Sequence, residues 1–418
     1  RTRKNDPYLA ISSTVYLNTP DGFTPMKESG VTKNIGAVSG SVFSDLDNDD
    51  DLDLILARQW NSPLVLINDN GTFSDQTTQW GLSKFHGLWN DLTTGDFNAD
   101  GRMDILLTNV GRNSRYREHL AEEIWLHVAD FNQDGIVEGI ESIWDPFLDK
   151  RVPVRGRSAL SKVLPWIAGM YPTFRAFGQA DVQAMLEPAG LTPTVLKLNR
   201  LDTTLFLNTG ESLEKVDLPA EAQFAPTFGC SVADFDGDEN EDIYLAQNFF
   251  NVDGESSRHD AGLGLVMLGD GQGGFRTLSS TESGVANLGQ ARGSVVSDFN
   301  GDGRVDLLTA QNNDRVKLHL NLTGKPGLRV RLKGAGENVQ AIGASIRLEQ
   351  NGFLGPKREI RLGSGYWSQD GLVQLFVVGD SKAKLHIRWA DSSIATVLIP
   401  AGAKAIVISQ TDGVKVGH

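Results

Sequence analysis

The chain has 418 residues, of which 40% are hydrophobic and 22% charged. This length exceeds one compact core of ordinary size, and the composition excludes wholesale disorder, so we expect two or three globular domains. With 39 Lys and Arg against 53 Asp and Glu, the net charge is −14. This balance argues against nucleic acid as a partner, because phosphate binding needs clustered basic residues. The single cysteine, Cys230, excludes an internal disulfide and a thiolate zinc site.

The sequence contains no clear signal for membrane insertion or for export. No apolar run approaches the roughly 18 residues needed to cross a bilayer, so we expect no membrane span. The opening residues RTRKNDPYLA contain neither an initiator Met nor an apolar stretch. We therefore expect the sequence to be a mature product or part of a longer protein.

A two-part unit recurs along the chain. One half is an apolar strand that ends in Leu-Asn or a similar pair, followed by a Gly-containing turn and an aromatic residue. Its copies are TVYLNTPDGF (14–23), LVLINDNGTF (64–73), TLFLNTGESL (204–213), LVMLGDGQGGF (265–275) and the truncated KLHLNLTG (317–324). The other half is a strand, an acidic loop and a strand, in FSDLDNDDDLDLILA (43–57), TGDFNADGRMDILLT (94–108), VADFDGDENEDIYLA (232–246) and VSDFNGDGRVDLLTA (296–310). The pattern predicts four antiparallel strands per unit, as in a β-propeller blade.

Two segments differ from the repeats. Between the second and third copies lies a segment that reads as mostly helical, with RYREHLAEEIWLHVA (115–129), SALSKVLPWIAGMY (158–171) and ADVQAMLEP (180–188) as its helices. The end of the chain contains strands without an acidic loop, which predicts a small β domain. We therefore divide the chain into repeats at 1–109 and 195–325, an insertion at 110–194 and a C-terminal domain at 326–418.

The four acidic loops share the spacing Asp-x-Asp/Asn-x-Asp-x-x-x-Asp. Side-chain oxygens at positions 1, 3, 5 and 9, with the carbonyl of position 7, converge on one point, and such hard oxygen ligands favour calcium. Carboxylates this close together would repel one another without a cation. Asp and Asn also favour turns on their own, an alternative that four matching copies make minor. The predicted ligands are Asp45, Asp47, Asp49, Asp51 and Asp53; Asp96, Asn98, Asp100, Arg102 and Asp104; Asp234, Asp236, Asp238, Asn240 and Asp242; and Asp298, Asn300, Asp302, Arg304 and Asp306.

Position 6 distinguishes the loops. Gly101 and Gly303 supply the residue that tolerates positive φ, whereas Asp50 and Glu239 replace it elsewhere, which makes the 234–242 loop the weakest of the four.

A fifth loop, DFNQDGIVEGIE (130–141), lies in the insertion. It matches the EF-hand pattern, with Asp130, Asn132, Asp134, the Ile136 carbonyl and the bidentate Glu141 as ligands. The competing interpretation is a fifth copy of the β-turn loop, because Glu138 falls at position 9. Four to five Ca²⁺ ions are expected, and five would bring the net charge to about −4. We expect the calcium to stabilise the fold.

These motifs resemble a known family. The acidic loops with their LxLN…G…F strands are similar to the FG-GAP or VCBS repeats of integrin alpha-type seven-bladed β-propellers, which bind calcium in these loops. The end of the chain resembles the ASPIC/UnbV domain through Ile342-Gly343-Ala344, Arg358-Glu359, Gly363-Ser364-Gly365-Tyr366, Ser368-Gln369 and the strand ending in Trp389. The order of parts is similar to that of cartilage acidic protein and its bacterial relatives, in which a helical segment like YPTFRAFGQADVQAML (171–186) also interrupts the repeats.

The resemblance implies a mainly β fold, namely a calcium-binding β-propeller with a helical EF-hand-type insertion and a small C-terminal β domain. It implies no assigned activity. Only four complete repeats and a partial fifth are present, whereas the family propeller has seven blades. Blades missing at the N-terminus, a partner chain that supplies them, or a smaller closed ring would each account for the difference.

Two function classes stay open. The first is a calcium-rigidified extracellular or periplasmic scaffold that presents propeller loops to a protein or carbohydrate partner. The second is a carbohydrate-active enzyme with its site at the mouth of the ring. Its candidates are Arg258, His259 and Asp260, where His and Asp would act as a base and Arg as an anion clamp; a solvated loop end is the competing interpretation.

Two features of lower weight complete the sequence analysis. A calcium sensor, a third function class, rests on the single EF-hand pattern. The aromatic residues Tyr366, Trp367 and Trp389 are interpreted as buried core residues, with sugar stacking as the alternative.

Overall fold

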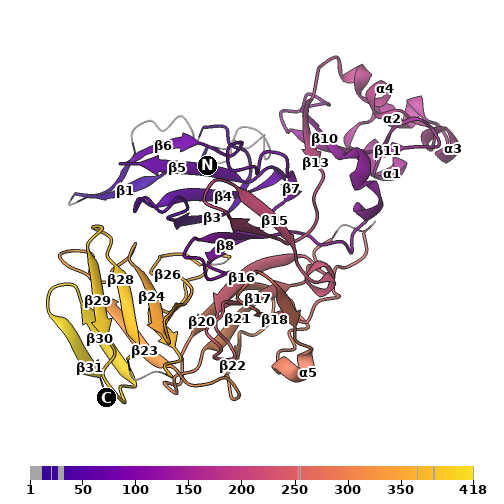
Figure 1. The fold of residues 1–418 in the computed structure, drawn as a ribbon. Coiled ribbons are helices and arrows are strands. Elements are labelled where there is room, and N and C mark those ends of the chain that lie inside the picture. Colours follow the sequence, from indigo (N-terminus) through magenta and orange to yellow (C-terminus); the bar gives the residue numbers. More distant parts are fainter. Residues whose placement is uncertain are drawn as a thin grey trace.

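The protein is mainly β, with few and short helices (Figure 1). A computed structural model describes residues 12–19, 21–26, 33–252, 254, 256–364, 366–379 and 382–417. The opening residues 1–11, on which the expectation about processing rests, and Gly365 of the C-terminal motif lie outside the described residues. Among the described residues, no helix has the length and apolar character needed to span a bilayer.

Four antiparallel sheets form the repeats, and each takes its strands in chain order. The first contains β3 (Val38–Ser44), β4 (Asp53–Asn61), β5 (Leu64–Asp69) and β6 (Thr72–Asp75), with β7 (Gly87–Leu88) beside β4. The second contains β8 (Asp91–Gly95), β9 (Asp104–Thr108), β14 (Thr204–Asn208) and β15 (Leu213–Asp217). The third contains β16 (Thr227–Ala233), β17 (Asp242–Gln247), β18 (Leu265–Gly269) and β19 (Phe275–Thr277), and the fourth contains β20 (Gln290–Ser297), β21 (Asp306–Asn312) and β22 (Lys317–His319).

In the sheets, each structural repeat begins at a different point from the unit expected from the sequence. Each sheet begins with the acidic hairpin and ends with the Leu-Asn half, because β4 pairs with β5 and β17 pairs with β18. The Leu-Asn strand at 204–208 therefore completes the second sheet by pairing with β9. It follows that the insertion interrupts the second repeat between its second and third strands, and does not lie between two repeats.

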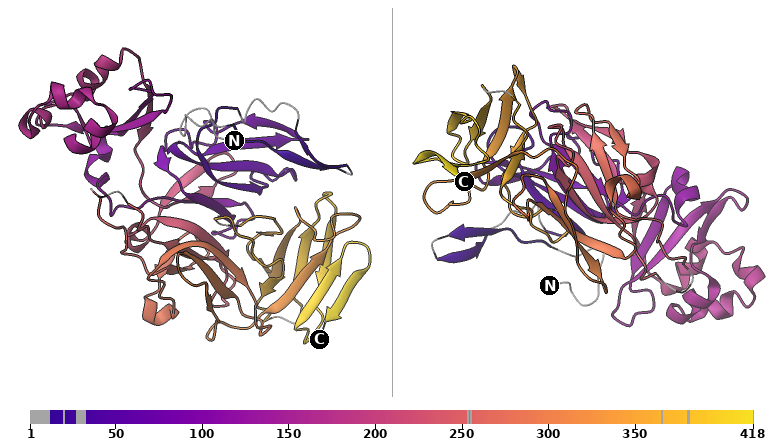
Figure 2. Two further views of the ribbon diagram at one scale, coloured as in Figure 1. Left: turned by 180° about the vertical axis from the view of Figure 1, so that it is seen from behind. Right: turned by 90° about the horizontal axis from the view of Figure 1, so that it is seen from below.

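The hairpin of β1 (Tyr16–Thr19) and β2 (Gly22–Pro25) is the Leu-Asn half of a unit without its acidic half among the described residues. Its side chains Tyr16, Leu17 and Phe23 are exposed, whereas Phe206 and Leu213 of the second sheet, which correspond to Tyr16 and Phe23, are buried. The four sheets lie side by side through their first strands β3, β8, β16 and β20 (Figures 1 and 2). The described residues close no ring, so the predicted calcium-binding β-propeller is not confirmed.

The insertion is built on a sheet in the order β12-β11-β10-β13. The strands are β10 (Ile124–Ala129), β11 (Glu138–Asp145), β12 (Lys150–Pro153) and β13 (Thr194–Leu198). The helices are α1 (Arg157–Val163), α2 (Trp166–Met170), α3 (Phe174–Phe177) and α4 (Val182–Leu186), with 3₁₀ turns at Arg117–Glu122 and Glu187–Ala189. Elsewhere in the chain, α5 (Ser280–Ser283) and a 3₁₀ turn at Ala220–Gln223 lie in connections.

The helix expected at 115–129 is wrong, whereas helices at 157–186 are present. Residues 124–129 form β10, in which Ile124, Leu126 and Val128 point to one face and pack on Trp60 and Leu88 of the first repeat. This alternation has the period of a strand, and burial of its apolar face prevails over the helical spacing.

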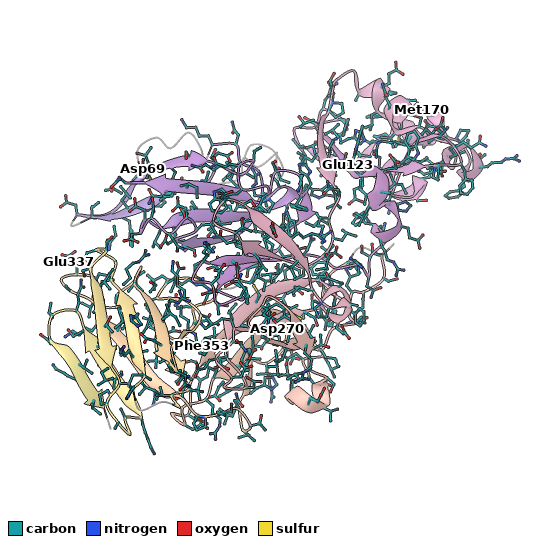
Figure 3. All side chains as sticks on the ribbon, in the orientation of Figure 1. Asp69, Glu123, Met170, Asp270, Glu337 and Phe353 are labelled. Carbon is teal, nitrogen blue, oxygen red and sulfur yellow. The ribbon has the colours of Figure 1, made fainter. Side chains whose placement is uncertain are left out.

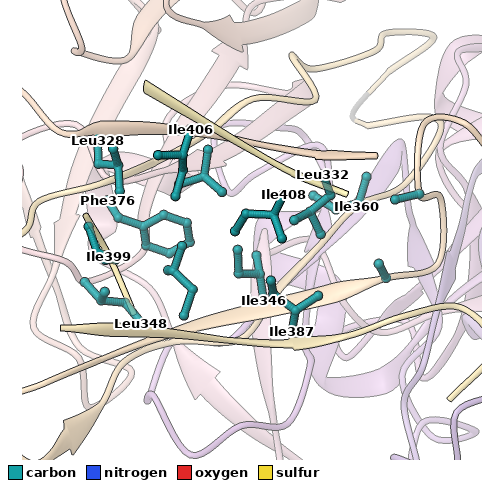
Figure 4. Packing of buried hydrophobic residues seen from close by; sticks show 14 of the residues in the cluster. Leu328, Leu332, Ile346, Leu348, Ile360, Phe376, Ile387, Ile399, Ile406 and Ile408 are labelled. Carbon is teal, nitrogen blue, oxygen red and sulfur yellow. The ribbon is translucent and has the colours of Figure 1, made fainter. Parts of the chain in front are cut away.

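The C-terminal domain consists of two sheets that enclose one core. One has the order β27 (Gln374–Phe376), β23 (Leu328–Lys333), β30 (Ala405–Ser409) and β31 (Gly413–Gly417). The other contains β25 (Phe353–Leu354), β24 (Ser345–Gln350), β28 (Lys384–Arg388) and β29 (Ile394–Leu398), with β26 (Arg358–Glu359) beside β24. Alternate residues such as Val330, Ile346, Ile387 and Ile406 fill the space between the sheets (Figure 4). The domain lies against the repeats, away from the insertion (Figure 1).

The aromatic residues of this domain divide into two groups. Trp389 is only 4% exposed and belongs to the core, as expected. Trp367 is 90% exposed, which corrects the interpretation of this residue as a core aromatic.

His127 on β10 gives the insertion a pH-dependent stability. Its buried Nε2 shares a hydrogen bond with Ser142 Oγ at 2.9 Å, and burial, aided by the charge of Arg151, lowers the pKa of His127 from 6.5 to about 4. The pKa of His127 is lower in the folded than in the unfolded protein, so the neutral imidazole contributes stability to the folded state. This stability is complete above about pH 6.5 and is lost as the pH falls towards 4. We expect His127→Gln to reduce the loss of unfolding free energy between about pH 7 and about pH 4 by about 2 kcal/mol. Urea unfolding at both pH values measures it, and equal losses in the two proteins would contradict the assignment.

Candidate metal centres

Five acidic loops each connect two antiparallel strands. We name them loop 1 (45–53, between β3 and β4), loop 2 (96–104, between β8 and β9), the insertion loop (130–138, between β10 and β11), loop 3 (234–242, between β16 and β17) and loop 4 (298–306, between β20 and β21). In every loop the ninth residue is the first residue of the second strand. The ninth side chain is therefore held by the sheet.

The five loops share one hydrogen-bond pattern. The N–H of position 2 donates to the carboxylate of position 9, at 2.7 to 2.9 Å, in Leu46–Asp53, Phe97–Asp104, Phe131–Glu138, Phe235–Asp242 and Phe299–Asp306. The N–H of position 5 donates to the side chain of position 3, and the N–H of position 7 donates to that of position 5, in all five loops. These bonds turn the odd-numbered side chains inward, as a common metal centre requires.

The backbone at position 6 is also the same throughout. Its φ is 88° at Asp50 and 78° at Glu239, and it is 89°, 85° and 85° at Gly101, Gly135 and Gly303. Asp50 and Glu239 therefore adopt the left-handed conformation that glycine adopts without strain. The lower calcium affinity expected for loop 3 stays a prediction.

The insertion loop is the fifth copy of the β-turn loop, and the EF-hand prediction is wrong. Strands flank the loop on both sides, where an EF-hand requires helices. Glu141, the expected twelfth ligand, lies on β11 opposite Leu126. Its carboxylate accepts hydrogen bonds from the Tyr116 hydroxyl and from Arg155 Nε. Glu138, the competing candidate, joins Asp130 and Asp134 instead.

The donor atoms fit a hard cation. Carboxylate oxygens lie within 4.8 Å of one another in loop 1, in the insertion loop and in loop 3. In loops 2 and 4 an asparagine amide replaces the carboxylate at position 3. The Oδ1 atoms of Asp45 and Asp96 are buried and have no hydrogen-bond partner. Buried oxygens without a partner are costly, and a bound Ca²⁺ would satisfy them.

The electrostatics of the loops point the same way. Burial raises the pKa of Asp104 and of Asp242 to about 8 and that of Asp53 to about 7, although each carboxylate accepts two backbone N–H bonds. The same cause raises the pKa of Asp96 and of Asp234 to about 6. The ionised carboxylates therefore need a nearby positive charge, which a divalent ion would supply.

The Leu-Asn motif serves the same centres. The second oxygen of the position-9 carboxylate accepts the N–H of the third strand, at 2.8 to 2.9 Å, in Asp53–Asn68, Asp104–Asn208, Asp242–Gly269 and Asp306–Asn321. Asn208 Nδ2 then donates to the Leu46 carbonyl of the preceding repeat, and Asn321 Nδ2 donates to the Phe235 carbonyl, both at 2.7 Å. The motif thus connects each of the four repeat loops to its own sheet, and in the second and fourth repeats it also contacts the preceding repeat, a role that its regular position in the sequence could have suggested.

Cations of the C-terminal domain face the repeat loops. Lys357 Nζ lies 3.3 Å from Asp45 Oδ2 and donates to Asn48 Oδ1 at 2.7 Å, and its N–H donates to Asp96 Oδ2 at 2.7 Å. Arg388 contacts the carboxylates of Asp45 and Asp50. These bonds occupy Oδ2 of Asp45 and of Asp96 and leave Oδ1 free for a metal.

Loops 2, 3 and 4 have their own arginines. Arg347 donates to the Ala99 carbonyl at 3.1 Å, Arg358 pairs with Glu241 of loop 3 at 2.6 Å, and Arg329 lies 3.3 Å from Asp298. Among the described residues, no ion pair connects the C-terminal domain to the insertion loop. The sequence analysis missed these partners, because they lie far from the loops in the chain.

Comparison with known proteins agrees with this geometry. The FG-GAP-like repeat family matches residues 45–107, and the ASPIC and UnbV family matches residues 334–415. The chain therefore combines an FG-GAP-like repeat with an ASPIC/UnbV domain. This confirms the resemblance seen in the sequence. The second to fourth sheets repeat the loop geometry of the matched segment, and we call all four FG-GAP-like repeats below.

Solved structures add little. The chain is similar to the exotype rhamnogalacturonan lyase YesX (11% identity, 96% of this chain and 76% of that one, TM-score 0.26). It is also similar to the rhamnogalacturonan lyase PL11 of Bacillus licheniformis (14% identity, 96% of this chain and 62% of that one, TM-score 0.25). A third similar structure is the rhamnogalacturonan lyase YesW (10% identity, 97% of this chain and 76% of that one, TM-score 0.24). Such low scores support no argument about function. No curated protein matches the sequence.

Arg258 and His259, two of the three candidate catalytic residues, contact Phe250 and Phe249. Arg258 stacks over the Phe250 ring at 4.1 Å, and the His259 backbone pairs with Phe249. Burial, aided by the charge of Arg115, lowers the pKa of His259. Among the described residues, no hydrogen bond joins His259 to Asp260, and the catalytic roles of these residues stay a prediction. Arg258 and His259 line a hollow of about 650 Å³ between the insertion and the third FG-GAP-like repeat.

Proposed function

We propose that this protein is a calcium-stabilised binding scaffold of the cell exterior or periplasm. The observation that supports this function best is the shared geometry of the five acidic loops. In loop 1, the insertion loop and loop 3 the carboxylate oxygens lie within 4.8 Å of one another, and in loops 1 and 2 a buried oxygen has no protein partner. Oxygen clusters of this kind are typical calcium ligands.

The proposed occupancy is five Ca²⁺ ions, one for each loop. Five divalent ions would add +10 to the net charge of −14. Metal bound to the folded chain alone contributes its binding free energy to folding. Calcium would therefore stabilise a chain that has no disulfide, since Cys230 is a free buried thiol.

Calcium binding and docking of the ASPIC/UnbV domain are proposed to support each other. The side chains of Lys357 and Arg388 donate to Asp45 Oδ2, and the Lys357 backbone N–H donates to Asp96 Oδ2. Groups that orient a metal ligand in this way commonly raise the affinity of the site. By linkage, the metal then strengthens the contact with the domain.

The repeats and the proposed metal support the proposed exterior location. FG-GAP-like repeats are typical of extracellular proteins, and the high calcium concentration outside the cytoplasm would keep weak sites filled. The partner is proposed to be a protein or a carbohydrate. An additional strand pair beside β1, from a partner chain or from a preceding segment, stays a prediction that the exposed Tyr16, Leu17 and Phe23 support.

A titration of metal-stripped protein tests the proposal. We expect Ca²⁺ at millimolar concentration to raise the melting temperature by roughly 10 °C or more, because several sites that bind only the folded chain act together. Mg²⁺ is the control, since it prefers a stricter octahedron with several waters and should have a much smaller effect. A melting temperature indifferent to Ca²⁺ would contradict the proposal.

A further inference from the structure

Trp367 is an exposed tryptophan in an unusual backbone conformation. Its side chain is 90% exposed, and its φ is 49°. One face of its indole ring stacks on Tyr366, with centroids 5.4 Å apart and ring planes within 4°. A bulky residue at positive φ is strained, and folds commonly keep such strain and such apolar exposure at functional positions.

The segment around Trp367 is firmly attached to the fourth FG-GAP-like repeat. Asp370 accepts the Val296 N–H at 2.8 Å, and the Gly371 N–H donates to the Val296 carbonyl at 2.9 Å. A Cβ atom at Gly293 would lie 2.5 Å from Ser368 Oγ, so glycine allows the segment to approach β20. The indole is thus held in place by the docked domain.

Aromatic rings continue from Trp367 onto the third FG-GAP-like repeat. Tyr366 meets the edge of Phe228 at 5.8 Å, and Phe228 lies 5.8 Å from Phe249. The guanidinium of Arg292 lies 3.9 Å from the centre of the Phe228 ring. We call these four rings, from Trp367 to Phe249, the aromatic strip. Phe228, Phe249 and Tyr366 are half-buried, so the strip reaches the surface.

The charge beside the strip is positive. Arg292 donates to the carbonyls of Asn248 and Ala291 and to the Gln290 side chain. Among the described residues, no carboxylate pairs with Arg292. Arg258 lies nearby over Phe250, which follows Phe249 of the strip. An arginine without a carboxylate partner beside aromatic rings favours a ligand that has both an apolar face and a negative charge.

We propose that the aromatic strip binds an acidic oligosaccharide, with a pyranose ring of a uronic acid on the free face of Trp367. The C–H face of such a ring is apolar and flat, and the carboxylate of a further uronate along the strip can pair with Arg292 or Arg258. This inference rests on the proposed scaffold function and names the partner class as carbohydrate. It also explains why Trp367 is exposed instead of buried.

Calorimetry on the calcium-loaded full chain tests the inference. The probes are tetragalacturonate, tetramannuronate, the neutral cellotetraose and tetraglutamate. We expect at least one uronate to bind, and Trp367→Ala to weaken its binding at least about tenfold. Trp367→Phe should retain part of the affinity. The matched control is Phe353→Ala, which removes an aromatic ring that is 79% exposed in the same domain and should leave binding unchanged (Figure 3).

The outcomes separate the proposals. If Arg258→Gln weakens the binding of uronates and leaves the binding of cellotetraose unchanged, the result supports pairing between the ligand carboxylate and an arginine. No uronate binding, equal binding by Trp367→Ala, or a preference for tetraglutamate would overturn the inference. Melting curves with Ca²⁺ are recorded on the same samples. If the calcium shift persists while uronate binding is missing, only this inference fails; if the shift is missing while binding persists, only the calcium proposal fails.

Discussion

Replacing Asp104 with alanine is expected to lower the free energy of unfolding of the calcium-loaded protein by about 4 kcal/mol. Asp104 is fully buried, and its two oxygens accept the N–H groups of Phe97 and Asn208, both at 2.8 Å. Loss of the carboxylate leaves two buried donors without an acceptor, at about 1–3 kcal/mol each, and removes a ligand from loop 2. Urea unfolding in calcium measures the difference.

Two further variants make the Asp104 experiment specific. Glu214→Ala removes an exposed carboxylate from β15 of the same sheet and should have almost no effect. Asp104→Asn keeps one acceptor oxygen and should have an intermediate effect. A cost below about 1 kcal/mol for Asp104→Ala would mean that the loop does not depend on its ninth residue.

Replacing Arg358 with methionine is expected to cost about 3–5 kcal/mol. Arg358 of the ASPIC/UnbV domain pairs with Glu241 of the third FG-GAP-like repeat at 2.6 Å, and both side chains are largely buried. Methionine leaves Glu241 as a buried charge without its partner, beside Asp234 and Glu239, and this situation is strongly destabilising. Urea unfolding in calcium again provides the measurement.

A double-mutant cycle identifies the cause of that loss. Glu241→Gln removes the charge that Arg358→Met leaves behind, so the double variant should be more stable than Arg358→Met alone. Arg331→Met, an exposed position on β23, is the control and should have little effect. Additive losses in the double variant would show that the ion pair does not couple the domain to the repeats.

The acidic loops could be predicted because their spacing acts locally. Asp, Asn and Gly within nine residues determine the turn, its inward side chains and its positive φ, and no distant partner is needed. The strand at which each repeat begins could not be predicted in the same way. The sequence alone does not say whether the Leu-Asn strand at 204–208 pairs with β9 or with a later strand, because pairing depends on the whole sheet.

The insertion shows a different limit. Residues 115–129 contain apolar positions that suit both a helical and a strand period. The contact of Leu126 and Val128 with the first repeat decides for the strand. Once β10 and β11 flank the insertion loop, Glu138 at position 9 replaces Glu141 at position 12 as the candidate ligand. A local misreading of secondary structure therefore changed a predicted ligand.

The contacts of the ASPIC/UnbV domain could not be predicted from the sequence. Lys357 and Arg388 lie 312 and 343 residues from Asp45 in the chain. Their roles depend on how the domain docks, and this follows from shape and burial over a large surface. The exposure of Trp367 depends on the same docking, so residue type alone predicted a core position for it.

The most direct test of the central claim is a count of the Ca²⁺ ions bound to each chain. Equilibrium dialysis of metal-stripped protein, followed by metal analysis, provides the count. The five-loop account predicts five ions in the wild-type protein and four after Glu138→Gln, which alters only the insertion loop. A wild-type chain that binds no calcium, or a Glu138→Gln variant that still binds as many ions as the wild type, would contradict it.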